Sequence, residues 1–123
     1  MFKVYSSSAG SGKTYTLTKE YLKLALHSNS ELYFRHILAV TFTNAAANEM
    51  KDRILLMLRT FSAYTENDAQ PHPMLRDVVI EMYPDTEHNA ELFAGACQLI
   101  AARAQMVFGQ ILHRYSDFSV MTI

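Results

Sequence analysis

The sequence predicts a helix-dominated α/β fold, and three observations carry that prediction. Half of the 123 residues are apolar, enough to bury a core. Only four glycines and three prolines occur, which are too few for the frequent turns of an all-β sandwich. Short apolar runs with strand character are followed by helical patterns, and the chain ends on another such run. This order indicates parallel strands flanked by helices.

The first half of the chain is predicted to fold as strand, loop, helix, strand and helix. An apolar stretch at 2–6 precedes a run of small residues and then a helical stripe from Lys13 to about His27. Residues 36–42 form a continuous apolar run, typical of a buried parallel strand. The next helix takes Asn44 as its N-cap. Its buried face is expected to comprise Met50, Ile54, Met57, Leu58 and Phe61.

The second half is predicted to be a helical insertion followed by a returning strand. A polar, proline-containing loop at 64–73 leads to a short helix over 75–82, which Pro84 stops. A long helix capped by Asp85 or Thr86 then runs to about Arg114, and Gly95 and Gly109 are candidate points for a bend or a split. Along one side of that helix the expected core residues are Leu92, Phe93, Ala96, Leu99, Ile100, Ala104, Val107 and Ile111.

These elements divide the chain into three parts: 1–63 begins an α/β domain, 64–114 is the insertion, and 115–123 is a return strand. The apolar ending leads us to expect a piece of a longer protein. A net charge of −1 excludes a globally basic nucleic-acid binder, so DNA contact must rest on a local patch or on stacking. The single cysteine, Cys97, and the absence of an 18-residue apolar run predict a cytoplasmic chain without a membrane span.

The strongest motif is the run of small residues Ser7-Ser8-Ala9-Gly10-Ser11-Gly12-Lys13-Thr14, between a strand and a helix. Glycines let main-chain N–H groups curl around an anion, and the helix start adds a positive dipole. Lys13 would reach the β- and γ-phosphates, and the Thr14 hydroxyl would ligate Mg²⁺. The pattern G-x-x-x-x-G-K-[ST] has glycine where this chain has Ser7. The run predicts a phosphate-binding loop, and the alternative is a chance helix start of small residues.

This loop and the segment 37–54, I-L-A-V-T-F-T-N-A-A-A-N-E-M-K-D-R-I, resemble motif I and the DNA-contacting motif Ia of superfamily 1 helicases of the UvrD/Rep class. The resemblance is closest to the RecB/AddA-like branch. The ending at 111–123 is similar to the approach to that family's T-I-D-S-F motif. The resemblance implies a partial RecA-like P-loop NTPase domain at the start of an ATP-dependent helicase or helicase–nuclease subunit of recombination and repair.

The resemblance also implies roles for individual residues. Lys13 and Thr14 would take part in ATP hydrolysis, with Mg²⁺ on Thr14, and the whole loop from Ser7 to Thr14 would bind the phosphates. The DNA-contacting residues would be Thr41, Phe42, Thr43 and Asn44. Phe42 would stack on a base of single-stranded DNA, whereas without the resemblance a phenylalanine that ends a strand is more often core. Ala45 stands where the family usually has lysine, which removes one phosphate contact, and Met121 replaces a small residue.

Phosphoryl transfer also needs an acidic pair that ends another strand and arginines from a second domain. No strand here ends in Asp-Glu, and the segment Val78–Glu81 fits a helix better. We therefore expect the chain alone to bind phosphates without useful turnover, to self-associate, and to act in a larger protein, with a helicase–nuclease subunit as a candidate partner. His36, His113 and Cys97 are expected to be structural. The alternatives are a complete small P-loop kinase and a non-catalytic module whose long helix docks a partner.

Overall fold

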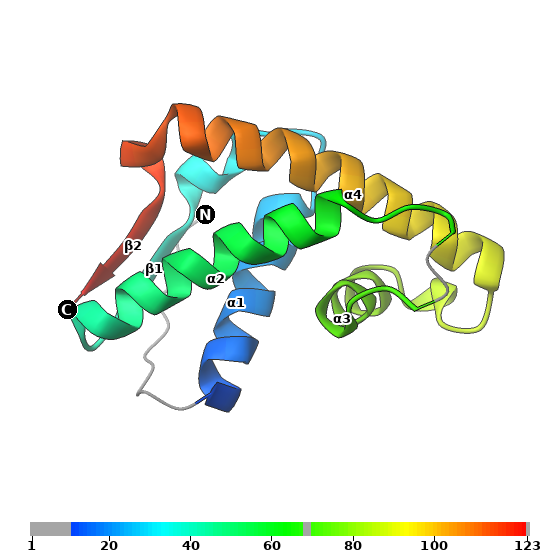
Figure 1. Cartoon of the computed structure of the whole chain (residues 1–123), viewed down its shortest axis with the longest axis horizontal. Helices are drawn as coiled ribbons and strands as arrows, with labels where there is room; N and C mark the ends of the chain where they lie inside the picture. The colour runs from blue at the N-terminus through cyan, green and yellow to red at the C-terminus, as the bar shows by residue number, and fades with distance from the viewer. Residues whose placement is uncertain (1–10, 68–69, 123) are drawn as a thin grey trace.

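The computed structural model describes residues 11–67 and 70–122 of the chain. The strand expected at 2–6 and the loop residues Ser7 to Gly10 lie outside the described residues. In chain order the helices and strands are α1 (Ser11–Leu26), β1 (Leu38–Thr41), α2 (Asn44–Ser62), α3 (Pro73–Met82), α4 (Ala90–His113) and β2 (Ser119–Thr122) (Figure 1). Short 3-10 turns lie at Tyr33–His36, Pro84–Thr86 and Tyr115–Asp117.

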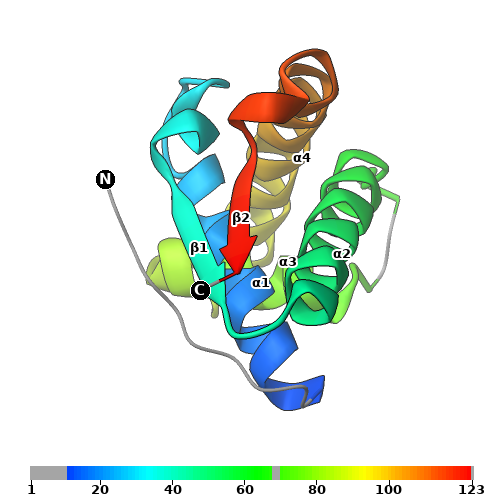
Figure 2. The ribbon, with the colours of Figure 1, turned by 90° about the vertical axis from the view of Figure 1, so that its left-hand side faces the viewer.

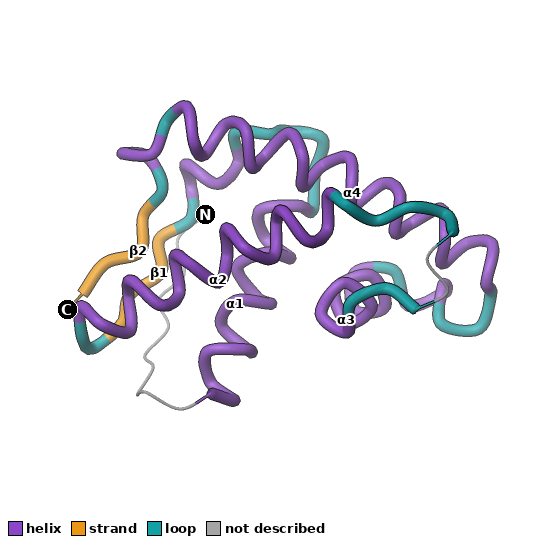
Figure 3. The backbone as a smooth tube through the Cα atoms, in the orientation of Figure 1, coloured by secondary structure: helices purple, strands orange, loops and turns teal. Residues whose placement is uncertain are grey.

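The two strands of the described chain pair in parallel, as the sequence predicts. Leu38 lies opposite Ser119 and Thr41 opposite Thr122, so both carboxyl ends meet at one edge of the sheet. Figure 2 shows the strands side by side, and Figure 3 shows how small the strand share is beside the helices. The strand predicted over 36–42 is shorter than expected because the 3-10 turn Tyr33–His36 takes up its beginning. The fold is a helix-dominated α/β unit.

One continuous apolar core joins the helices and the strands. Among its largest fully buried side chains are Tyr21 from α1, Phe61 from α2 and Ile100 from α4. The predicted buried face of α2 is confirmed, since Met50, Ile54, Met57, Leu58 and Phe61 are all buried. The helices of the predicted insertion therefore share the core of the rest of the described chain. They do not build a core of their own.

Both predicted helix caps are wrong, by one residue for α2 and by three or four for α4. Thr43 caps α2, because its backbone is extended and its hydroxyl accepts from the Ala46 N–H at 3.0 Å, whereas Asn44 is the first helical residue. Asn89 caps α4 in the same way, accepting from the Leu92 N–H at 3.1 Å. The expected caps of α4, Asp85 and Thr86, lie in the 3-10 turn before it. A cap needs an extended backbone, which composition alone does not reveal.

The long helix α4 differs from its prediction in two respects. It continues unbroken through Gly95 and Gly109. Leu92 and Leu99, expected in the core, are 53% and 41% exposed. The physical reason is that α4 carries apolar residues around most of its circumference, so periodicity alone does not select the buried side. By length and composition α4 could cross a membrane, and in this structure its inward side packs against α2 and α3.

Candidate functional site

Hydrogen bonds tie the carboxyl ends of the two strands to the start of α2. The Thr41 hydroxyl lies within reach of two carbonyl oxygens, those of Thr43 at 3.1 Å and Met121 at 3.3 Å. The Thr122 hydroxyl donates to the Asn44 Oδ1 at 2.6 Å. Three of the four predicted DNA-contacting residues, Thr41, Thr43 and Asn44, thus belong to one polar network at this edge of the sheet.

Phe42 lies at the centre of this edge and is 57% exposed. Its neighbour Thr41 is 1% exposed, because side chains alternate along an extended chain and Thr41 takes the inward position. Among the described residues Phe42 therefore does not take the core position that a strand-ending phenylalanine usually takes. A flat apolar ring beside hydroxyl and amide groups is an arrangement that can stack on a base and hydrogen-bond a backbone.

The helix α1 begins within the predicted phosphate loop. Ser11 to Thr14 form its first turn, whereas Ser7 to Gly10 lie outside the described residues. That turn contains no acidic residue, so nothing in it repels an anion at the positive end of the helix. Thr14 is 6% exposed, and its hydroxyl is a hard oxygen donor of the kind that Mg²⁺ accepts. The chemistry of Thr14 is compatible with its predicted role as a magnesium ligand.

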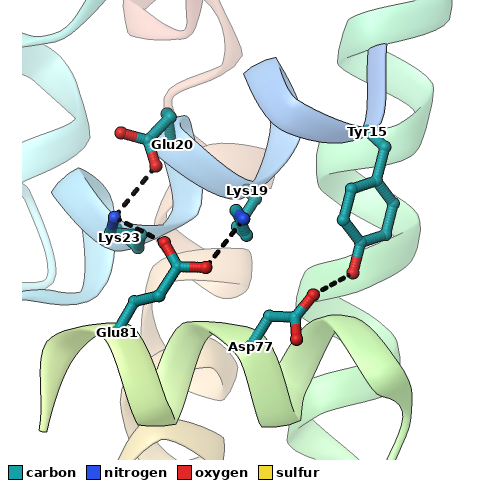
Figure 4. Close-up of polar contacts among 6 residues, drawn as sticks. All are labelled: Tyr15, Lys19, Glu20, Lys23, Asp77 and Glu81. Carbon is teal, nitrogen blue, oxygen red and sulfur yellow. Dashed lines mark hydrogen bonds and ion pairs between the residues drawn. The ribbon is translucent and has the colours of Figure 1, made fainter. Parts of the chain in front are cut away.

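Polar contacts fasten α1 to α3 close to this first turn (Figure 4). The Tyr15 hydroxyl donates to the Asp77 Oδ2 at 2.6 Å. One turn further along, the ammonium group of Lys19 lies 2.7 Å from Glu81, and that of Lys23 lies 2.9 Å from the same carboxylate. Tyr15 directly follows the predicted magnesium ligand in the chain, so α3 holds the helix at the point where the phosphate loop ends.

The charge states of these groups follow from their surroundings. Burial, then the hydrogen bond to Asp77, raises the pKa of Tyr15 to about 12, so its hydroxyl stays a proton donor at neutral pH. The hydrogen bond from Lys19 holds the pKa of Glu81 below its usual value, against the effect of burial. Although desolvation alone would lower it, the hydrogen bonds to Glu20 and Glu81 raise the pKa of Lys23. Glu81 and Lys23 are therefore both charged at neutral pH.

The other end of α1 is held by Arg103 of α4. Its guanidinium donates to the Leu26 carbonyl at 3.0 Å, to the Tyr83 hydroxyl at 3.2 Å and to the Asn29 Oδ1 at 2.8 Å. A cation at the carboxyl end of a helix also interacts favourably with the helix dipole. Residues of the predicted insertion thus fix α1 at both ends.

Sequence reasoning missed the contacts of Asp77, Glu81 and Arg103 with α1, and it weighed Glu81 only as a possible strand-end acid. A signal existed for the first two: they are four residues apart on α3, as Tyr15, Lys19 and Lys23 are on α1. Each set lies on one side of its helix, and the charges are complementary. No comparable signal marks Arg103, because its partners are distant in sequence and all three are uncharged.

The remaining candidates lie in different surroundings. Cys97 is fully buried, and burial raises the pKa of its thiol to about 11, so it is a small apolar filler of α4. Glu81 lies on a helix and not at a strand end. His36 and His113 are exposed. Within 11–67 and 70–122, no group of three or more His, Cys, Asp or Glu residues is placed to hold a metal ion.

The fold and the site together define a class of protein. In α/β folds, ligands bind beyond the carboxyl ends of parallel strands, where the loops into the next helices lie. The edge at Thr41 and Thr122 has this geometry, and Figure 2 shows the first turns of α1 and α2 toward the same end of the molecule. The chain is therefore an α/β protein with a loop-lined edge at the carboxyl ends of its parallel strands. Residues 3–116 match the family described as the UvrD/REP helicase N-terminal domain, and the chain belongs to that family.

Several curated proteins resemble part of the chain. An ATP-dependent helicase/nuclease protein of Clostridium novyi is 47% identical over 49 residues, which are 40% of this chain and 4% of that protein. For the "RecBCD enzyme subunit RecB" of Chlamydia muridarum, identity is 52% over 48 residues, 39% of this chain and 5% of the relative. The "ATP-dependent DNA helicase SRS2" of Saccharomyces cerevisiae is 50% identical over 50 residues, 41% of this chain and 4% of the relative.

The matched segments therefore span about a twentieth of the length of these relatives. No solved structure matches the chain.

Proposed function

We propose that the chain is the ATP-binding N-terminal part of an ATP-dependent DNA helicase or helicase–nuclease subunit that acts in recombination and repair. One observation carries the proposal: the phosphate-loop sequence runs directly into the first turn of α1, in a chain of the UvrD/REP family. In this proposal the unit is part of a RecA-like domain. The cytoplasm is its expected location, and a helicase–nuclease subunit is an expected partner.

The loop from Ser7 to Thr14 binds the phosphates of ATP in this proposal. Its backbone N–H groups and the positive end of α1 surround the anion. Lys13 places a point charge on the β- and γ-phosphates, and Thr14 holds Mg²⁺ through its hydroxyl oxygen. When bound, Mg²⁺ neutralises charge on the phosphate oxygens. The contacts of Tyr15 and Lys19 with α3 fix the direction of the helix that carries Lys13 and Thr14.

The strand-end edge binds single-stranded DNA in the same proposal. Phe42 offers an exposed ring for a base, and the exposed Thr43 and Asn44 supply polar groups for the sugar–phosphate backbone. Thr41, which the resemblance also assigned to DNA contact, is 1% exposed and instead holds the strand end through its hydroxyl. Ala45, where related helicases usually have lysine, removes one phosphate-directed charge. We therefore expect a DNA affinity with a weaker dependence on salt than a lysine at this position would give.

The phosphate site is tested by replacing Lys13. Lys13→Ala should weaken ATP or ADP binding by about 1.5–3 kcal/mol, the scale of a hydrogen bond to a charged group, in isothermal titration calorimetry. Lys51→Ala is the matched control, because Lys51 lies on α2, where its ammonium group faces the Tyr115 ring at 5.5 Å, and it should leave nucleotide affinity unchanged. Equal nucleotide binding by wild type and Lys13→Ala would show that the phosphate-loop assignment is wrong.

Hydrolysis is expected to need more than this chain. The acidic residues that position the attacking water and the arginines that neutralise the transition state are assigned to other parts of the enzyme, and loss of an arginine finger alone costs about 10³–10⁵ in rate. Purified residues 1–123 should therefore release phosphate from ATP no faster than a Lys13→Ala control. Sustained turnover that depends on Lys13 would instead favour a complete small kinase.

A further inference from the structure

The side of α4 that points away from the other helices is apolar along most of its length. Leu92, Leu99 and Met106 are 53%, 41% and 55% exposed, although each is large and apolar. The residues that α4 buries, among them Ile100 and Ile111, lie on the opposite side. Figure 1 shows α4 along the upper edge of the molecule with α1, α2 and α3 below it. Within the described chain, this apolar surface has no cover.

The exposed residues follow a seven-residue repeat of the kind that coiled coils use. Leu92, Leu99 and Met106 are seven residues apart and occupy equivalent positions of the repeat. Three residues after each of them comes a small residue at the second seam position of the heptad. We call the combined set the outward seam: Leu92, Gly95, Leu99, Ala102, Met106 and Gly109. Large and small residues alternate along it without exception.

The two glycines of the outward seam are not required by the packing of the described chain. A Cβ atom added at Gly95 or Gly109 would meet nothing within 4 Å. Neither glycine has a positive φ. A glycine in a helix interior costs about 1 kcal/mol relative to alanine. The space over both positions is compatible with the close approach of another helix.

We propose that the outward seam pairs with the same seam of a second copy of this chain, with the two α4 helices antiparallel. In that register Leu92 faces Gly109 of the second copy, Leu99 faces Ala102, and Met106 faces Gly95. Each large side chain then meets a small one, which allows close packing at a short distance between the helix axes. A parallel pair would place large against large and small against small, and would leave gaps. The sequence of the seam is therefore complementary to itself in one direction only.

Charge also favours a second copy of this chain as the partner of the outward seam. None of the six seam positions carries a charge, so two copies do not repel each other there. In the antiparallel register Glu91 of one helix lies opposite the uncharged Gln110 of the other, so its carboxylate faces no like charge there. The helix dipoles are then opposed, which is favourable. Beside Leu99 and Met106 lies a groove of about 270 Å³ that the loop Ser28–Glu31 also lines, and it gives the larger side chains of the second copy room.

The first test is the mass of the chain in solution. Sedimentation equilibrium of residues 1–123 over a concentration series should give a mass that rises toward twice 14.0 kDa. Leu99→Glu and Ala102→Glu place charges next to the two-fold axis and should each weaken dimerisation by at least about tenfold. The matched control is Leu56→Glu, which changes a leucine of similar exposure on α2 and should leave the dimer intact.

The second test fixes the direction of the pairing. Residues 92 and 109 of two copies lie opposite each other in the proposed register, whereas the two copies of residue 92 lie roughly 25 Å apart, far beyond disulfide range. A Leu92→Cys variant mixed with a Gly109→Cys variant should form a heterodimeric disulfide under mild oxidation. The Leu92→Cys variant alone should form none.

Three results would overturn the proposal. The first is a monomer at every concentration, and a monomer that also co-sediments with phosphatidylcholine vesicles would assign the surface of α4 to a membrane. The second is a dimer that survives both Leu99→Glu and Ala102→Glu, which would place the interface elsewhere. The third is efficient disulfide formation by Leu92→Cys alone, which would show a parallel pair.

Discussion

The strand-end edge and the helical core of this molecule place the same kind of side chain in opposite surroundings. Phe61, in α2, is 0% exposed and packs among residues of several helices, whereas Phe42, at the end of β1, is 57% exposed. Both lie in apolar stretches of the sequence. Burial of the Phe61 ring in the core stabilises the fold by about 1.5–3 kcal/mol, the usual range for a side chain of this size. The edge leaves its ring in water.

The difference shows that the side chains that stabilise the fold and the side chain available to a ligand lie in different regions of this chain. At the edge, hydrogen bonds of Thr41 and Thr122 hold the strands and the start of α2 together without help from the aromatic ring. The ring of Phe42 contributes little to stability there, and an exposed aromatic side chain with polar neighbours is suited to a ligand. The following predictions test this contrast, beginning with the largest expected effect.

Loss of the core ring should have the largest effect on folding. Phe61→Ala should lower the free energy of unfolding by about 3–5 kcal/mol, because it removes a fully buried side chain and leaves a cavity. Urea denaturation followed by circular dichroism measures this change. Phe42→Ala serves as the comparison and should stay within about 0.5 kcal/mol of wild type. Similar losses in both variants would remove the contrast between the two regions.

Loss of the edge ring should instead weaken DNA binding. In the full-length enzyme proposed above, Phe42→Ala should lower single-strand affinity by about 1–3 kcal/mol and leave nucleotide binding unchanged. Because the ring carries no charge, the salt dependence of the affinity should not change. Fluorescence anisotropy with a labelled oligonucleotide, repeated at several salt concentrations, measures both. Leu56→Ala, at a comparably exposed position on α2, should have no effect on DNA.

The threonines of α2 offer a smaller contrast, between a helix end and a helix interior. Thr43→Ala removes the N-cap bond to the Ala46 N–H and should cost about 1 kcal/mol of stability. Thr60→Ala removes only a bond to the Leu56 carbonyl, which is already part of the helix, and should be close to neutral. Thermal denaturation of the two variants side by side measures the difference. Equal losses would mean that Thr43 does not act as a cap.

The smallest predicted effect is a dependence on alkaline pH. The pKa of Tyr15 is raised from 10.0 to about 12 in the folded chain, so its contribution is complete below pH 10 and is lost as the pH rises from 10 to 12. The stability difference between wild type and Tyr15→Phe should therefore shrink over that interval. Urea titrations from pH 9 to 12 measure it, and Tyr21 titrates equally in both proteins. A constant difference would show that folding does not raise the pKa of Tyr15.

The sequence alone determined the parts of this protein that depend on local chemistry. The helical stripe after Lys13, the buried face of α2 and the stop at Pro84 all follow from residues close together in the chain. The phosphate loop is likewise a local pattern, and it remains a prediction because Ser7 to Gly10 lie outside the described residues. The family resemblance rested on two contiguous segments, and the match over residues 3–116 confirms it.

Only the tertiary structure decided which surfaces face water. Apolar residues surround most of α4, so the position of α2 selected the side with Ile100 for burial and left the side with Leu99 exposed. The bond between Tyr15 and Asp77 joins residues 62 positions apart, so the matching spacing on the two helices suggests possible partners but only their packing brings the two side chains together. The exposure of Phe42 follows in the same way from the path of the chain between β1 and α2. Burial depends on what packs against a residue, and in this chain those neighbours are distant in sequence.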